Sequence, residues 1–62
     1  MMIVDDLLDY CSDRGMMTVS LYNLDLDKEV YRGAGDEIPE QYLDMEVQSY
    51  DVPDGITFTI NI

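Results

Sequence analysis

Carboxylates are the residues of this sequence whose number and spacing could support chemistry. Fourteen of the 62 residues are Asp or Glu and three are Lys or Arg, so the formal net charge is −11. Pairs such as Asp36/Glu37 and Asp44/Glu46 could act as general acid and base only in a pocket that separates their pKa values. Such a pocket encloses roughly 300 Å³ or more, which a chain this short can hardly provide beside a core. The sequence therefore predicts a protein that is not an enzyme.

Nucleophilic and zinc chemistry are also disfavoured. Cys11 is the only cysteine and there is no histidine. An intrachain disulfide and a structural zinc site are thus excluded, and a serine nucleophile would lack a histidine base. Cys11 falls on an apolar stripe, where a thiol usually packs as a small hydrophobic group. We expect no catalytic residue and no cofactor.

One spacing resembles a calcium loop. Asn23, Asp25 and Asp27 occupy the first, third and fifth positions of an EF-hand pattern. The sixth and twelfth positions of such a loop require Gly and a bidentate Glu. They hold Lys28 and Ala34 here. A hairpin turn with solvated carboxylates is the preferred interpretation, and no metal site is predicted.

An N-terminal helix is predicted over residues 2–13. Ile3, Leu7 and Cys11 recur at the four-residue spacing of one helix face. Gly15 is placed to end this helix in the left-handed conformation. The helix would bury its apolar stripe against the rest of the chain.

After the helix the pattern changes to the two-residue period of strands. Strands are predicted at 16–24, 29–32, about 45–51 and 56–62. Gly33 and Gly35 close the second strand as a flexible hairpin exit, and 36–43 forms a crossing segment with Pro39 at the start of a short helix. The turn before the last strand is Pro53-Asp54-Gly55. The inward residues of the last strand are Ile56, Phe58, Ile60 and Ile62.

These elements predict one α+β domain over residues 1–62. Its N-terminal helix would pack on a small antiparallel sheet of about four strands and cover one face of it. The order of the strands is left open.

The start of the chain lacks the basic region and apolar stretch of a signal peptide, and no apolar run approaches the roughly 20 residues of a membrane span. A lone thiol suits a reducing compartment. The expected location is the cytoplasm.

The charge indicates what kind of partner the chain would bind. Arg14, Lys28 and Arg32 are too few and scattered for direct contact with nucleic acid or anionic membranes. Carboxylates on a rigid sheet can imitate the spacing of phosphates, and tyrosines among them can act as anchors. We therefore predict a basic partner, such as a nucleic-acid-binding protein. The predicted contact residues are Asp25, Asp27, Glu29, Asp36, Glu37, Glu40, Asp44 and Glu46, with Tyr31 and Tyr42 as anchors.

Other interpretations of the acidity remain open. The carboxylates could serve solubility alone, in a small structural or regulatory domain that self-associates. If the apolar last strand lay at a sheet edge, it could pair with its counterpart in a homodimer. Adaptation to high salt is a third interpretation, because Asp outnumbers Glu and Lys is scarce.

Three stretches resemble small uncharacterised proteins of phages and other mobile elements in Gram-positive bacteria. They are residues 22–33 (from Tyr-Asn-Leu-Asp through Val-Tyr-Arg-Gly), 36–44 (Asp-Glu-Ile-Pro-Glu-Gln-Tyr-Leu-Asp) and 46–52 (Glu-Val-Gln-Ser-Tyr-Asp-Val). That group has no established activity to carry over. In size, acidity and layout the chain is also similar to phage-encoded nucleic-acid mimics, including some anti-CRISPR inhibitors. This similarity implies an inhibitor that blocks the basic surface of a protein such as a CRISPR effector, and it assigns no residue.

Overall fold

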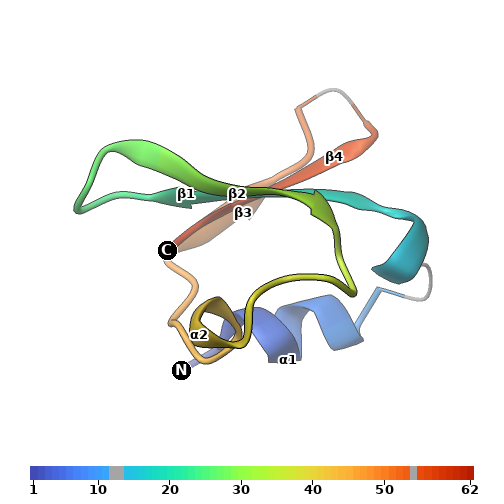
Figure 1. Ribbon diagram of the computed structural model, residues 1–62, viewed down its shortest axis with the longest axis horizontal. Coiled ribbons are helices and arrows are strands. Elements are labelled where there is room, and N and C mark those ends of the chain that lie inside the picture. The colour runs from blue at the N-terminus through green and yellow to red at the C-terminus, as the bar shows by residue number, and fades with distance from the viewer. Residues whose placement is uncertain (12–13, 54) are drawn as a thin grey trace.

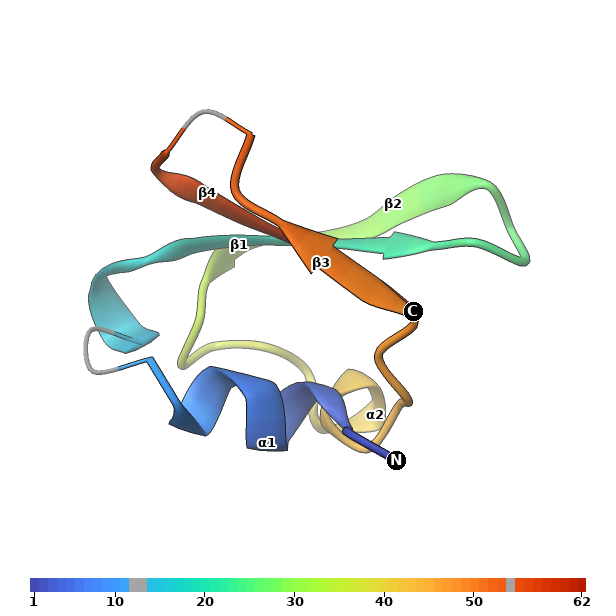
Figure 2. The same ribbon diagram turned by 180° about the vertical axis from the view of Figure 1, so that it is seen from behind.

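The fold consists of a helical layer on one face of a four-stranded sheet (Figures 1 and 2). The computed structural model describes residues 1–11, 14–53 and 55–62. Its elements are α1 (Val4–Asp9), the 3₁₀ turn η1 (Arg14–Met16), β1 (Thr18–Asn23), β2 (Lys28–Ala34), α2 (Glu40–Leu43), β3 (Ser49–Asp51) and β4 (Thr57–Asn61). The α+β class and the helix packed on a sheet are confirmed.

The N-terminal helix is shorter than predicted. Val4, Leu7 and Leu8 are buried, as the apolar stripe requires, but α1 ends at Asp9. Before it, the main chain is extended and pairs with another segment: Val4 N donates to Met45 O (3.0 Å). These main-chain hydrogen bonds replace the first predicted helical turn.

The predicted end of the helix also differs. Ser12 and Asp13 lie outside the described residues, and Gly15 belongs to η1 rather than to a left-handed cap. Among the described residues, positive φ angles occur at Asp27 and Gly55. Gly55 follows Asp54, which the structure does not describe, and its N donates to Val52 O (3.2 Å), as a turn here requires.

The first hairpin forms as predicted, with an irregularity. The register pairs Leu21 with Tyr31 but Tyr22 with Glu29, so that Val30 is an extra residue in β2. Such a bulge increases the local twist of a strand. Val30 and Tyr31 both pack against the core.

The sheet is mixed, and this corrects the expected antiparallel arrangement. The strand order is β2-β1-β4-β3, and β4 runs parallel to β1, with Val19 opposite Phe58 and Leu21 opposite Ile60. Residue alternation fixes which side chains face inward but not the direction of a strand relative to its neighbour. The direction follows from the crossing segment, which passes through α2 and brings the chain back to the far side of β1. There β4 receives a neighbour on each side, and the short, exposed β3 takes the edge.

One core joins the two layers. Its buried apolar residues are Val4, Leu7, Leu8, Val19, Leu21, Ile38, Phe58, Ile60 and Ile62. Three of the four inward residues predicted for the last strand are thus confirmed. Ile56 is the exception, because it precedes β4 and is 76% exposed. Met45 and Val47 pack against the core from the segment that precedes β3.

Candidate partner-binding surface

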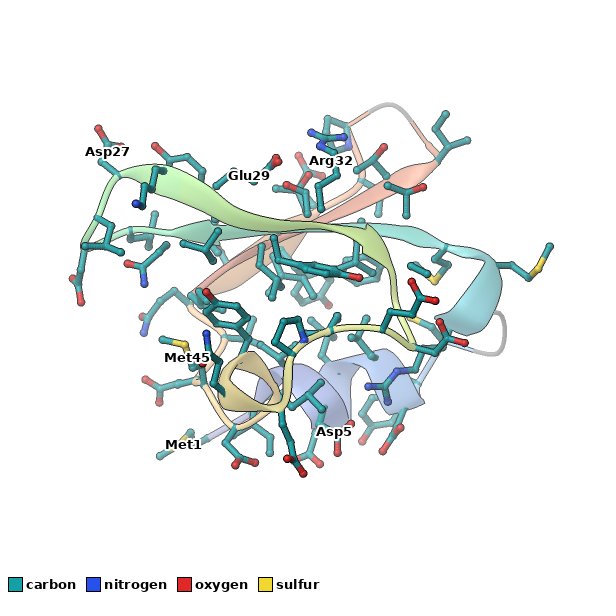
Figure 3. The ribbon with its side chains drawn as sticks, viewed as in Figure 1. Met1, Asp5, Asp27, Glu29, Arg32 and Met45 are labelled. Carbon is teal, nitrogen blue, oxygen red and sulfur yellow. The ribbon has the colours of Figure 1, made fainter. Side chains whose placement is uncertain are left out.

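Five of the eight predicted contact carboxylates lie in the helical layer. Asp36, Glu37, Glu40, Asp44 and Glu46 are all exposed and belong to α2 and its flanking segments. Figure 3 shows carboxylate oxygens along the side of the molecule where α1 and α2 lie, with Asp5 among them. The fold therefore gathers these residues on the side opposite the open face of the sheet.

The first helix adds carboxylates that the predicted site omitted. Asp5, Asp6 and Asp9 lie on α1 among residues whose neighbours Val4, Leu7 and Leu8 are buried. The same periodicity that buries one face of the helix turns the acids outward. We call the combined set the acidic belt: Asp5, Asp6, Asp9, Asp36, Glu37, Glu40, Asp44 and Glu46.

Arg14 is the basic residue of the helical layer and connects its parts. Its Nη1 lies 3.0 Å from Asp5 Oδ1 and 2.8 Å from Asp9 Oδ1. Its Nε donates to Gly35 O at 2.9 Å. Arg14 thus holds α1 against the start of the crossing segment, while its charge offsets only a small part of the belt.

The other three predicted carboxylates lie apart, on the first hairpin. Asp25 and Asp27 are in the turn between β1 and β2, and Glu29 is on β2. The Tyr22 hydroxyl donates to Asp27, and this hydrogen bond, with burial and the Asp27 charge, raises the pKa of Tyr22. The predicted set therefore forms two groups rather than one surface.

Glu29 belongs to a hydrogen-bonded network on the sheet face away from the helices (Figure 3). Arg32 donates to it through Nε (3.2 Å) and Nη2 (3.1 Å), and the buried Ser20 donates through Oγ (2.7 Å). The hydrogen bond from Arg32, and then that from Ser20, lowers the pKa of Glu29. Glu29 serves the structure of the hairpin.

This network predicts a pH-dependent contribution to stability. Because the folded chain lowers the pKa of Glu29, its contribution is fully present above the ordinary value of 4.5. It is lost as the pH falls through the folded-state value. Urea unfolding should show Glu29→Gln to be less stable than the parent at pH 7, with the difference shrinking at pH 3. The control Glu40→Gln removes an exposed belt carboxylate and should be no less stable than the parent. A Glu29→Gln deficit that persists at pH 3 would contradict the assignment.

The two predicted anchors lie within the fold. Tyr31 and Tyr42 are half-buried and pack against the core. The Tyr31 hydroxyl donates to Ala34 O (2.7 Å), and burial, with the charges of Glu37 and Asp36, raises its pKa. The more exposed tyrosines are Tyr10 (81%) and Tyr50 (57%), which the predicted site did not include.

The described residues form neither a pocket nor a metal site. In residues 1–11, 14–53 and 55–62 there is no pocket and no cluster of three potential metal ligands. Cys11 is half-buried, and its thiol points to Leu7 O at 4.0 Å. No helix in the described part of the chain is long and apolar enough to cross a membrane. The acidic belt and the turn of the first hairpin are the candidate binding surfaces of the described residues.

Comparison with known proteins identifies no relative of this chain. No protein-family model matches the chain, no curated protein matches it, and no solved structure matches it.

Proposed function

We propose that this chain is a non-enzymatic binding protein whose acidic belt occupies the basic surface of a nucleic-acid-binding protein. The observation that carries the proposal is the presence of eight carboxylates in the helical layer, of which two, Asp5 and Asp9, are paired with Arg14. Seven of the eight residues are exposed, and Asp5 is partly buried. A partner that binds phosphates through Lys and Arg would meet the belt with complementary charge.

The frame beneath the belt favours this role. The helical layer is fixed to the sheet by the buried Val4, Leu8 and Ile38. Carboxylates on such a frame keep their relative positions when the partner binds, so that little ordering entropy is lost. A field of one sign also accelerates encounter with a basic surface, at a rate that falls with ionic strength. Charge of this density exceeds what solubility requires of a small domain.

The biological setting is part of the proposal. An intracellular inhibitor from a phage or mobile element, acting on a protein such as a CRISPR effector, would need only size, charge and rigidity of this kind. No substrate has to be turned over, and the lone cysteine and lack of histidine agree with that.

Competition with nucleic acid tests the proposal. The chain is immobilised, and a panel of purified basic nucleic-acid-binding proteins, including RNA-guided nucleases, is passed over it. We expect at least one protein to be retained, to dissociate faster as salt rises from 50 to 300 mM, and to be displaced by a DNA duplex. Retention that the duplex does not reverse, or retention of none, would refute mimicry.

A matched pair of variants tests the belt itself. In the first, Asp36→Asn, Glu37→Gln, Glu40→Gln and Asp44→Asn remove four charges; in the second, Asp36→Glu, Glu37→Asp, Glu40→Asp and Asp44→Glu keep them. We expect the neutral variant to bind the retained protein about 100-fold more weakly, about 2.7 kcal/mol, and the charge-retaining variant to lose less than about tenfold. Equal binding by the neutral variant would contradict an electrostatic role.

A further inference from the structure

The turn of the first hairpin presents apolar side chains that the core does not use. Leu24 is 49% exposed and Leu26 is 59% exposed, in alternation with the exposed Asp25 and Asp27. Turns of this kind favour Asn, Asp, Gly and Pro. The conformation of the turn therefore does not explain why two leucines occur in it. In Figures 1 and 2 the turn projects at one end of the sheet, beyond the helical layer. We call residues Leu24, Asp25, Leu26 and Asp27 the hairpin tip.

The tip is held in one conformation from both sides. Asn23 Oδ1 accepts a hydrogen bond from Leu26 N (3.0 Å), and Tyr22 donates its hydroxyl to Asp27. The main chain is tied to the end of the chain, because Leu24 N donates to Ile62 O (2.9 Å) and Ile62 N to Tyr22 O (2.8 Å). Asp27 adopts a left-handed φ of 54°, a conformation that Asp tolerates better than most residues other than Gly. The leucines are therefore presented on a preorganised turn.

We infer that the hairpin tip inserts Leu24 and Leu26 into an apolar cleft of the partner that is bordered by Lys or Arg. The border follows from charge complementarity, because Asp25 and Asp27 alternate with the leucines and the whole chain carries a net charge of −11. A second copy of this chain is a poor occupant, since its own −11 would face the tip. This inference rests on the proposed function and deepens it: the belt accelerates encounter, and the tip slows dissociation.

The molecule is small enough for the acidic belt and the hairpin tip to reach the same partner. The principal extents of the molecule are 28 × 22 × 19 Å. An ordinary protein interface covers about 800 Å² on each side. Apolar groups buried at its centre govern the dissociation rate, whereas exposed charges govern the association rate and its salt dependence.

The rate constants separate the two roles. The probe is the panel protein that the parent chain retains and that a DNA duplex displaces. For Leu24→Ser/Leu26→Ser we expect dissociation to be at least tenfold faster, with the association rate and its salt dependence within twofold of the parent. Leu24→Met/Leu26→Met should keep the slow dissociation. The control Met16→Ser/Ile56→Ser changes side chains that are 88% and 76% exposed, and it should dissociate like the parent.

Each outcome decides between the proposals. Unchanged dissociation of the serine variant, with weak binding by the neutral belt variant, would overturn the tip and leave the proposed function standing. Equal acceleration by the Met16→Ser/Ile56→Ser control would also overturn the tip. Retention of no panel protein would overturn both proposals. Sedimentation that shows self-association of the parent, lost in the serine variant, would identify a second copy as the occupant and overturn the tip assignment.

Discussion

Replacing Gly35 with alanine is expected to leave most of the protein unfolded at 25 °C. Gly35 is buried where η1 meets the end of β2, and an added Cβ would lie 2.5 Å from Arg14 O. It would also lie 3.3 Å from Arg14 Cγ and from Val19 Cγ2. A main-chain oxygen cannot turn aside as a side chain can. The clash can be relieved only by moving η1 away from the sheet.

That movement would break the contacts that join the layers. Gly35 N donates to Met17 O (3.3 Å), and Arg14 Nε donates to Gly35 O (2.9 Å). Overpacking of this kind costs about 1–3 kcal/mol, and lost hydrogen bonds add about 1 kcal/mol each. A domain of this size has about 3–5 kcal/mol of net stability. With two hydrogen bonds lost, Gly35→Ala should cost about 3–5 kcal/mol in total, as much as the whole net stability.

Gly15→Ala is the matched control. Its added Cβ would meet Asp36 Oδ2 at 2.9 Å, but this atom is the end of an exposed side chain that can rotate away. Urea unfolding followed by far-ultraviolet circular dichroism should show a loss below about 1 kcal/mol for Gly15→Ala. If Gly35→Ala unfolds at the same urea concentration as Gly15→Ala, the contact between Gly35 and Arg14 is not the constraint described here.

The sequence could not distinguish these glycines. Gly33 and Gly35 were expected to serve a flexible hairpin exit, because local sequence shows only that a glycine is present. Their surroundings differ: a Cβ on Gly33 would lie 2.8 Å from the hydroxyl of Tyr31, two residues away, whereas one on Gly35 would meet the main chain of Arg14, 21 residues away in the chain. Contacts at that separation depend on topology, which local periodicity does not contain.

Periodicity was most informative about which side chains face inward. It identified Phe58, Ile60 and Ile62 of the last strand, all of which are buried. It could not provide the parallel pairing of β1 with β4, because both directions place the same residues on the inner face. It also extended α1 and β4 too far, since Met2 and Ile56 match the apolar pattern but lie outside these elements.

The sequence predicted only part of the candidate surface, because local pattern does not show which segments the fold brings together. Acids in the crossing segment were recognised from composition and lie together in the helical layer. Asp5, Asp6 and Asp9 were not included in the predicted set, although their place opposite the apolar stripe already indicated exposure. Tyr31 was expected to be an exposed anchor, whereas it pairs with the buried Leu21 and packs on the core. That pairing depends on the register of the hairpin, which residue alternation alone does not contain.

The last strand allows an internal test of burial. Ile60 is fully buried, opposite Leu21 of β1 and Tyr50 of β3, whereas Ile56 is 76% exposed four residues earlier. Truncation of a buried Ile to Ala costs about 2–5 kcal/mol through lost burial and the cavity left behind. Ile60→Ala should therefore unfold most of the protein, while Ile56→Ala should change the free energy of unfolding by less than about 0.5 kcal/mol.

The comparison of Ile60→Ala with Ile56→Ala also tests the position of β4 in the sheet. If β4 lay at an edge, Ile60 would have a neighbour on one side only and its truncation would be better tolerated. A graded variant keeps the result measurable: Ile60→Val should lose about 0.5–1.5 kcal/mol in urea unfolding. Equal effects of Ile56→Ala and Ile60→Ala would be incompatible with the central position of β4. A small loss for Ile60→Val together with unfolding of Ile60→Ala would support burial of Ile60 between the helical layer and the sheet, because the larger truncation leaves the larger cavity.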